Sequence, residues 1–294
     1  MSPWTDIATQ ISMATGIPFA VEKISAVGGG CINQTHRIEG NGHRFFVKLN
    51  SADSLAMFEA EAAGLQEIHN SGTLRVPMPV CWGKNTLKAW LVLEYLEMGD
   101  ISNGDAAVLG SGLAAMHRFS SEKFGWKRDN TIGATPQINE LSTNWVQFWR
   151  KYRLGYQLEL ARVNGHTGKL QTQGEQLMAQ LESFFPGPEP VASLLHGDLW
   201  SGNYNIDCTG QPVLFDPAPY YGDRETDIAM TELFGGFSAV FYATYREVYP
   251  LDPGYATRKT LYNLYHVLNH LNLFGGGYLH QAEQMMGRLL AEIR

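Results

Sequence analysis

The stretch "LLHGDLWSGNYNID", residues 194–207, decides the fold. It places His196, Asp198 and Asn203 close together in a short segment that follows an apolar pair and contains two glycines. An ordinary surface turn needs at most one such polar residue, whereas catalytic side chains are often carried by loops that follow rigid elements. The stretch therefore predicts a catalytic loop.

A second acidic residue completes a recognisable order. The apolar segment "VLFDP" ends in Asp216, and the carboxylate of Asp216 and the amide of Asn203 are hard oxygen ligands of the kind that suits Mg²⁺. Either residue alone is more often a turn former. Asp198, Asn203 five positions later, and an apolar strand ending in a second Asp together form the skeleton of a kinase catalytic loop and metal site. We expect Asp198 to accept the proton of the attacking hydroxyl, Asn203 and Asp216 to hold Mg²⁺, and His196 to shape the loop.

A phosphotransferase of this kind also needs a lysine on a strand and a glutamate on the following helix. Lys48 lies in "FFVKLN", where apolar neighbours predict a largely buried strand, although a solvated lysine at a strand end is equally compatible. Glu61 lies near the middle of the next predicted helix and could form an ion pair with Lys48. Glu59 is the competitor, but the pattern E-x-x-G-L that begins at Glu61 favours the inward face.

Two segments are candidates for nucleotide contacts. In "GGGCIN" we expect the backbone N–H groups of Gly29 and Gly30 to cover the ATP phosphates, although most such glycine runs are hairpin turns. In "LEYLEMG" we expect Glu94, Tyr95 and Leu96 to offer backbone groups to the adenine ring. The set of features in this order indicates an ATP-dependent phosphotransferase.

The predicted elements indicate an α+β, bilobal protein-kinase-like fold with a small β-rich N-lobe, 1–96, and a large helical C-lobe, 97–294. In the N-lobe we expect strands over 21–30, 31–40, 43–50, 79–83 and 88–99, with helices over 3–16 and 54–72. In the C-lobe we expect helices over 104–118, 141–163, 169–184, 224–234, 238–248, 256–274 and 278–293. Strand-like pieces of the C-lobe are expected only in "VASLLH", "NYNID" and "PVLFDP".

Composition excludes several classes of protein. The chain has 22 Lys and Arg against 29 Asp and Glu, a net charge of −7, which argues against a nucleic-acid binder. Its N-terminus lacks the features of a signal peptide, and no apolar run approaches the ~18 residues of a membrane helix. Three scattered cysteines without a C-x-x-C pair argue against structural zinc and a disulfide framework. We expect a cytoplasmic protein with neither nucleic acid nor membrane as a partner.

The segment after Asp216 argues against a protein kinase. Only "PAPYYG" separates Asp216 from a helix predicted to begin near Asp223, which leaves no room for an activation segment or a peptide-docking groove. We therefore expect a constitutively competent enzyme whose acceptor is a small group.

The combination of "HGDLWSGN" with "DPAPYYGDRETDIAMTELFGGF" closely resembles the fructosamine kinase (ketosamine kinase) family, relatives of the aminoglycoside phosphotransferases. The resemblance runs over essentially the whole chain and includes "GGGCINQTH", "FVKLN", "MFEAEAAGL", "VLEYL", "GLAAMH" and "WVQFWRKYRL". It implies phosphorylation of the 3-hydroxyl of a ketosamine, the sugar adduct that glycation leaves on protein or amino-acid amines. The 3-phosphate would then eliminate and regenerate the free amine. By the motif match, Asp198 carries over as proton acceptor, Asn203 and Asp216 as metal ligands, and Lys48 with Glu61 as the phosphate-side pair.

Four further residues have both a functional and a plain structural interpretation. Asp227 is expected to hydrogen-bond the backbone of the catalytic loop, although as a carboxylate near a helix N-terminus it could simply suit the helix dipole. Trp200 and Tyr220 are expected at the substrate, with Trp200 stacking on the sugar, and core packing is the alternative for each. Cys31 is a redox candidate, because relatives carry a cysteine here in a loop associated with redox sensitivity. Oxidation or an intermolecular disulfide, giving a homodimer through Cys31, would impair ATP binding, and the alternative is a packing residue.

Two other functions remain as alternatives at this point. A kinase for an aminoglycoside, choline or homoserine would share the motifs, but a polycationic antibiotic would favour a strongly acidic cleft, and residues 222–294 hold eight acidic and six basic side chains. A binding module of pseudokinase type would require the loss of Lys48, Asp198 or Asp216, and all three are present.

Overall fold

The computed structural model describes residues 2–28, 32–99 and 103–293. The chain forms two compact units, one of Met1–Asp105 with Asn205–Pro217 and one of Ala106–Tyr204 with Ala218–Arg294. The sequence analysis placed the boundary at residue 96 and assigned residues 205–217 to the second lobe.

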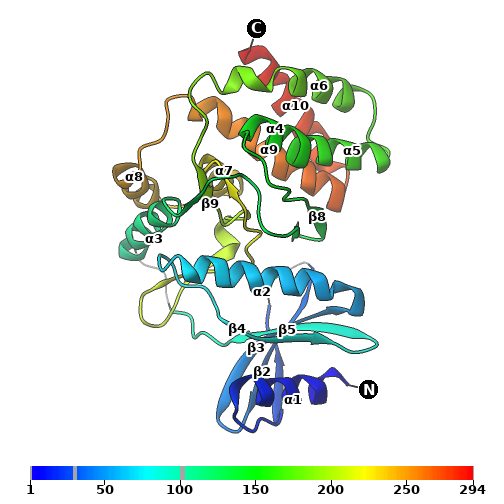
Figure 1. Cartoon of the computed structure of the whole chain (residues 1–294), viewed down its shortest axis with the longest axis vertical. Coiled ribbons are helices and arrows are strands. Elements are labelled where there is room, and N and C mark those ends of the chain that lie inside the picture. Colours follow the sequence, from blue (N-terminus) through cyan, green and yellow to red (C-terminus); the bar gives the residue numbers. More distant parts are fainter. Residues whose placement is uncertain (1, 29–31, 100–102, 294) are drawn as a thin grey trace. The chain divides into compact units, whose positions relative to one another are not determined.

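The first unit is built on a five-stranded antiparallel sheet with the order β1-β2-β3-β5-β4 (Figure 1). Its strands are β1 (Lys23–Ala26), β2 (Gln34–Gly40), β3 (His43–Ser51), β4 (Pro79–Lys84) and β5 (Lys88–Glu94), and its long helices are α1 (Pro3–Thr15) and α2 (Leu55–Asn70). Asn41 and Gly42, with φ of 50° and 77°, make the two-residue turn between β2 and β3, as the primed hairpin turns require. All seven elements correspond to elements predicted from the sequence.

The alternation of side chains along β3 separates its core residues from its lysine. Val47 and Leu49 point to one face, where they join an apolar cluster that includes Ile7 and Ile11 of α1. Because successive side chains of a strand point to opposite faces, Lys48 must lie on the other face of the sheet. There it meets α2. A strand buried on both faces can therefore carry a buried lysine.

Residues 205–217 belong to the first unit because they pair with its backbone. Gly99 N donates to the carbonyl of Ile206, and Cys208 N donates to the carbonyl of Glu97. The strands β10 (Tyr204–Ile206) and β11 (Pro212–Leu214) form a two-stranded sheet. Asp207 closes the connecting turn, since one carboxylate oxygen accepts hydrogen bonds from residues 209 and 211 and the other pairs with Arg75. This hairpin delivers Asp216 to the first unit.

The second unit is mainly helical. Its helices are α3 (Asn103–Met116), α4 (Trp145–Trp149), α5 (Tyr156–Val163), α6 (Lys169–Ala179), α7 (Glu225–Leu233), α8 (Ala239–Val248), α9 (Tyr255–Phe274) and α10 (Gly277–Glu292). The long helix α9 lies at its centre, packed against α5, α7 and α10 (Figure 1). Its short strands are β6 (Ser120–Ser121), β9 (Ala192–Leu194) and β12 (Tyr221–Gly222), which form one sheet in the order β12-β9-β6, and the hairpin β7 (Asn130–Ile132) with β8 (Thr135–Gln137).

Two predictions for the second unit were wrong in detail. The helix expected over 141–163 begins only at Trp145, because Asn144 caps it by accepting a hydrogen bond from the backbone of Gln147. It then passes through a π-helical segment, Arg150–Gly155, before α5. The short strands β6, β7, β8 and β12 were not predicted, since two or three residues are too few to show a period. The aromatic residues of α4 are buried, as expected for a core helix.

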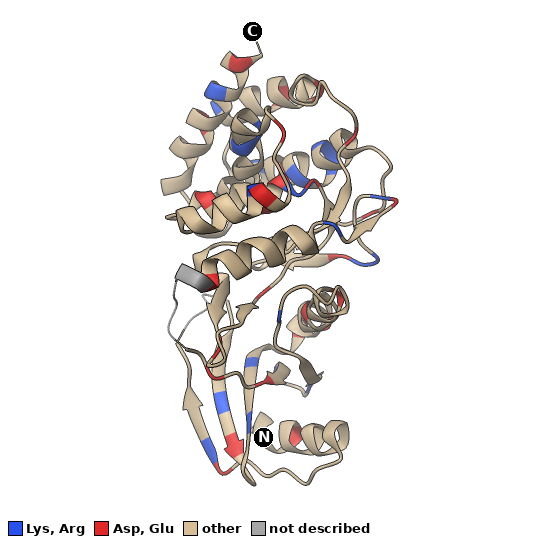
Figure 2. Ribbon diagram, turned by 90° about the vertical axis from the view of Figure 1, so that its left-hand side faces the viewer, with Lys and Arg blue, Asp and Glu red and all other residues tan. Residues whose placement is uncertain are grey.

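Charged residues are interspersed along both units without a long run of one sign (Figure 2). Within the residues that the structure describes, no helix is long and apolar enough to cross a membrane.

Candidate active site

In the first unit, one lysine bridges two carboxylates. Lys48 is only 4% exposed, and its Nζ donates hydrogen bonds to Glu61 of α2 and to Oδ1 of Asp216. The contact with Glu61 is the ion pair expected from the sequence. Burial alone would lower the pKa of Lys48, but the carboxylates of Asp216 and Glu61 outweigh it and raise the pKa. Lys48 is therefore charged at neutral pH, and one positive charge faces two acidic side chains.

Asp216 has an unusual backbone. Its φ is 51°, and it is one of two non-glycine residues with positive φ in the described part of the chain. Asp tolerates this left-handed region better than most residues, at a cost that is typical of functional sites. One carboxylate oxygen is held by Lys48, and the side chain is 47% exposed. The second oxygen is thus available to a ligand.

In the second unit, the catalytic loop follows β9. Gly197 has a φ of 83°, and a Cβ at this position would lie 2.0 Å from the carbonyl oxygen of Ala218. Ala218 N in turn donates to the carbonyl of His196, so the loop is bonded to the segment that follows Asp216 in sequence. His196 is fully buried, and its Nδ1 accepts from Asp198 N at 3.3 Å. Its position fits the loop-shaping role that we expected.

Asp227, at the start of α7, holds the same loop by its backbone. Its two carboxylate oxygens accept hydrogen bonds from His196 N at 2.7 Å and from Gly197 N at 2.9 Å. Burial alone would raise the pKa of Asp227, but the hydrogen bond from His117 and the backbone donors lower it. A buried, ionised Asp227 therefore fixes two consecutive N–H groups next to Asp198.

A residue that we did not single out from the sequence, His117, extends this arrangement. Its Nε2 lies 3.1 Å from Asp227 and its Nδ1 lies 2.7 Å from the hydroxyl of Tyr245, which accepts a hydrogen bond from Arg224 at 2.9 Å. Burial lowers the pKa of His117, so the ring is neutral. Because the hydroxyl of Tyr245 accepts from Arg224, it can donate its own proton to Nδ1 of His117. The imidazole proton then lies on Nε2 and points at Asp227. The only sequence signal was a histidine at the end of a predicted helix.

We expect Asp227→Asn to destabilise the protein by about 2–4 kcal/mol, because its NH₂ group replaces a carboxylate oxygen that accepts from one or two of the three donors around Asp227. Since the pKa of Asp227 is lowered from its ordinary 3.8, the stabilisation is complete above that pH and is lost as the pH falls through the lowered value. Urea unfolding at pH 7, 5 and below 4 measures it. The difference in the free energy of unfolding between the variant and the wild type should be equal at pH 7 and pH 5 and should become smaller below pH 4. A difference that grows in acid would contradict this assignment.

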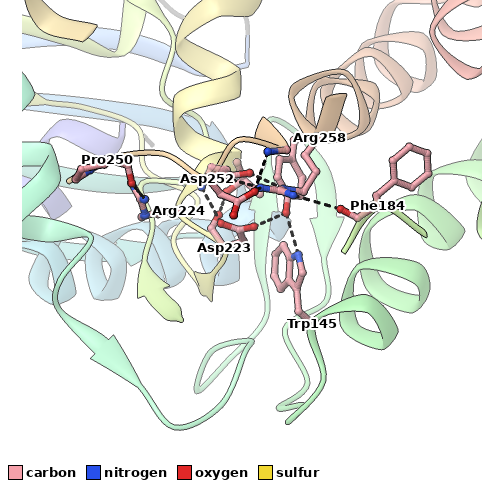
Figure 3. Close-up of polar contacts among 11 residues, drawn as sticks. Trp145, Phe184, Asp223, Arg224, Pro250, Asp252 and Arg258 are labelled. Atoms are coloured by element: carbon pink, nitrogen blue, oxygen red, sulfur yellow. Dashed lines mark hydrogen bonds and ion pairs between the residues drawn. The ribbon is translucent and has the colours of Figure 1, made fainter. Parts of the chain in front are cut away.

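An ionic cluster with a buried centre, Arg258 and Glu225, holds the start of α7 (Figure 3). The guanidinium of Arg258 on α9 makes a bidentate pair with Glu225 at 2.7 and 2.9 Å and a further bond with Asp252 at 2.7 Å. Asp223 accepts from Glu225 N at 3.0 Å and from the hydroxyl of Tyr262 at 2.5 Å. Because bidentate pairs fix geometry, this cluster positions the helix that carries Asp227.

Asn203 and Asp198 are in direct contact. The amide nitrogen of Asn203 donates to the carbonyl oxygen of Asp198 at 2.8 Å and to its Oδ2 at 3.3 Å. The side-chain oxygen of Asn203 is therefore the atom that remains for a cation.

The two aromatic candidates differ in exposure. Trp200 is 38% exposed and is therefore able to meet a ligand. Tyr220 is 2% exposed, with its ring 4.0 Å from the guanidinium of Arg153 and stacked on Phe148. This placement makes Tyr220 a packing residue and corrects the substrate contact that we expected of it.

The three candidates for contacts with the adenine ring lie at the end of β5 and directly after it. Glu94 N donates to the carbonyl of Met78, and the Glu94 side chain accepts from Met78 N, so the Glu94 N–H is already used. The ring of Tyr95 lies beneath the guanidinium of Arg44 at 5.4 Å. Leu96 is half-buried. Three further candidates lie outside the described residues: Gly29, Gly30 and Cys31.

A strand lysine paired with a helix glutamate, an aspartate after the β10–β11 hairpin and a loop that carries Asp198 and Asn203 are the features expected of a phosphotransferase of the protein-kinase-like class. The fructosamine kinase family model matches residues 3–292. Over 290 residues the chain is 48% identical to a "probable ketoamine kinase" of Synechocystis, covering 98% of this chain and 97% of that protein. It is 39% identical to a chloroplastic protein-ribulosamine 3-kinase of Oryza sativa, covering 98% and 85% of the two chains. The chain belongs to the fructosamine kinase family and is a kinase.

Solved structures confirm the predicted fold. A crystal structure from Haemophilus somnus, named as a "putative fructosamine-3-kinase", matches with a TM-score of 0.89 at 28% identity, over 98% of this chain and 97% of that one. A thermostable mutant of the aminoglycoside phosphotransferase APH(4)-Ia, in complex with ADP and hygromycin B, matches with a TM-score of 0.66 at 16% identity over 98% of both chains. The second match shows the fold alone.

Proposed function

We propose that this protein transfers the γ-phosphoryl group of ATP to the 3-hydroxyl of ketosamines, including fructosamine and ribulosamine adducts on amino-acid or protein amines. The observation that carries the proposal is the similarity over the whole chain to relatives named as ketoamine and ribulosamine kinases. Elimination of the 3-phosphate would then regenerate the amine, so the enzyme would promote deglycation. We also propose a cytoplasmic location.

Asp198 is the proton acceptor in this proposal. Its carboxylate is half-buried, next to Asn203, in a loop whose backbone is held by Asp227. A carboxylate fixed in this way can orient the sugar hydroxyl and take its proton as the bond to phosphorus forms. Lys48 supplies a positive charge for the phosphates, and Glu61 holds Lys48 in place.

The residues present also fit Mg²⁺. Asp216 has a carboxylate oxygen that Lys48 does not use, and Asn203 has a side-chain oxygen that its own hydrogen bonds leave unused. Mg²⁺ is usually bound in kinases by one or two such protein oxygens together with phosphate oxygens, so no larger cluster of acidic residues is needed. When bound, the ion would neutralise charge on the transferred phosphates.

The remaining candidate residues are assigned to the nucleotide, the sugar and redox chemistry. We assign the N-lobe, with Gly29, Gly30 and the segment that contains Tyr95 and Leu96, to ATP. We assign Trp200, which is exposed beside Asp198, to the sugar. Cys31 stays a proposed redox site through which a homodimer could form.

A substrate panel tests the function. We expect robust ATP consumption with glycated lysine, and none above background with choline, kanamycin or free aldoses, because recognition would require the ketosamine 3-hydroxyl at Asp198. Coupled ADP detection with the purified protein measures it. The Asp198→Asn variant is the control for contaminating kinases. Phosphorylation of choline or kanamycin with no turnover of any ketosamine would favour a different small-molecule kinase.

A further inference from the structure

A line of aromatic rings begins at the catalytic loop. Trp200 follows Asp198 by two positions and donates its backbone N–H to the carbonyl of Asp198 at 3.2 Å. Its ring centroid lies 6.5 Å from that of Phe234, which lies 4.9 Å from that of His270. His270 in turn lies 5.5 Å from Phe274. We call Trp200, Phe234, His270 and Phe274 the aromatic strip. All four belong to the second unit.

Local sequence fixes both ends of the aromatic strip. A Cβ at Gly202 would lie 2.3–2.7 Å from three atoms of the Trp200 indole, so the ring lies directly over a residue that has no side chain. Phe274 is the last residue of α9, and Gly275, with a φ of 87°, ends that helix. Trp200 therefore lies on a loop, and Phe274 lies at the end of a long helix, positions that often carry binding residues.

The aromatic strip is exposed at its two ends. Trp200 is 38% and Phe274 is 55% exposed, while Phe234 and His270 are half-buried. Among the described residues, four Phe or Trp side chains are exposed, and two of them are the ends of this strip. Exposed aromatic side chains on linked rings of this kind often mark a ligand-binding surface.

The strip carries no net charge. His270 donates Nδ1–H to the carbonyl of His266 at 2.8 Å, and burial lowers the pKa of His270, so the ring is neutral at pH 7. Neutral aromatic faces attract a cation within about 6 Å of the ring centroid, and they also cover alkyl chains. The strip therefore suits a ligand that has a cationic group followed by an apolar chain.

The ketosamine has this structure. Its nitrogen is bonded to C1, separated from C3 only by C2, so an adduct whose 3-hydroxyl meets Asp198 has its protonated amine close by, within reach of the first rings. In an adduct of lysine, the alkyl chain of the side chain continues beyond the nitrogen.

We propose that the aromatic strip binds the amine-bearing arm of the ketosamine, with Phe274 contacting the alkyl chain, and that it thereby selects adducts of long alkyl amines over adducts of short amines. This inference rests on the proposed function. It assigns Phe234, His270 and Phe274 as specificity-determining residues, in addition to the contact of Trp200 with the sugar.

The test uses Phe274→Ala and two substrates that share the same sugar. One is fructosyl-lysine with a blocked α-amino group, and the other is fructosyl-methylamine. We expect kcat/KM for fructosyl-lysine to fall by about five- to tenfold, mainly through KM, and that for fructosyl-methylamine to change less than about twofold. Phe119→Ala, which truncates another exposed phenylalanine of the second unit that is not part of the strip, should leave both values unchanged.

The outcomes separate this inference from the proposed function. If the wild type turns over both ketosamines and Phe274→Ala lowers both equally, or neither, the arm does not contact the strip and the inference is wrong. If the wild type phosphorylates no ketosamine, the proposed function fails first and the inference falls with it. Equal melting temperatures of the variants and the wild type exclude a loss of fold as the cause.

Discussion

We expect Asp198→Asn to lower kcat by about 10²–10⁴-fold while the fold and ATP binding stay intact. The amide has the same shape as the carboxylate, and its oxygen can still accept the hydrogen bond from Asn203. It cannot take the proton of the sugar hydroxyl. Single-turnover rates with saturating ATP and glycated lysine measure the effect, and circular dichroism shows whether the fold is kept.

Asp53→Asn is the matched control, because Asp53 is an exposed carboxylate that no proposed role involves. Its kcat should equal that of the wild type. Near-normal turnover of the purified Asp198→Asn protein would remove Asp198 from the mechanism.

Asp216→Asn has the second largest expected effect, a loss of about 10²–10³-fold in kcat/KM for ATP with Mg²⁺. The exchange removes a charged oxygen ligand and, among the described residues, leaves Glu61 as the one acidic partner of Lys48. Asparagine is the informative replacement, because it tolerates the left-handed backbone at this position, whereas alanine would add a strain of roughly 1 kcal/mol.

Titration of nucleotide binding with and without Mg²⁺ measures the effect of Asp216→Asn. The variant should bind ATP with an affinity that depends much less on Mg²⁺ than that of the wild type. An unchanged dependence on Mg²⁺ would place the metal site elsewhere.

Sequence reasoning reached the contact of Lys48 with Glu61 because a phosphotransferase of this kind needs a strand lysine and a glutamate on the following helix. The apolar neighbours of Lys48 indicated a buried strand, and the pattern E-x-x-G-L favoured Glu61 over Glu59. The expected contact of Asp227 with the loop rested on resemblance to related kinases, and the structure shows the hydrogen bonds themselves.

Non-local contacts account for what was missed. His117 contacts Asp227 across 110 positions of the chain, and no period or motif links the two residues. Residues 205–217 join the first unit because their backbone pairs with residues 97–99 and Asp207 pairs with Arg75, contacts that the sequence does not display.

Tyr220 shows the same limit in an aromatic side chain. Its position close to Asp216 in sequence suggested a ligand, but the π-helical turn brings Arg153 against its ring, and the resulting stack buries both residues. The exposure of Tyr220 is therefore determined by Arg153, which packs from the π-helical turn, and not by the proximity of Tyr220 to Asp216 along the chain.

The central claim is that the acceptor atom is the 3-hydroxyl of a ketosamine. The most direct test is ³¹P and ¹³C NMR of a reaction containing the purified protein, ATP, Mg²⁺ and fructosyl-lysine labelled at C3. We predict a phosphate coupled to C3, followed by the decay of this signal and the appearance of free lysine. A stable phosphate on another carbon, or turnover of ATP with no phosphate on the sugar, would contradict the account.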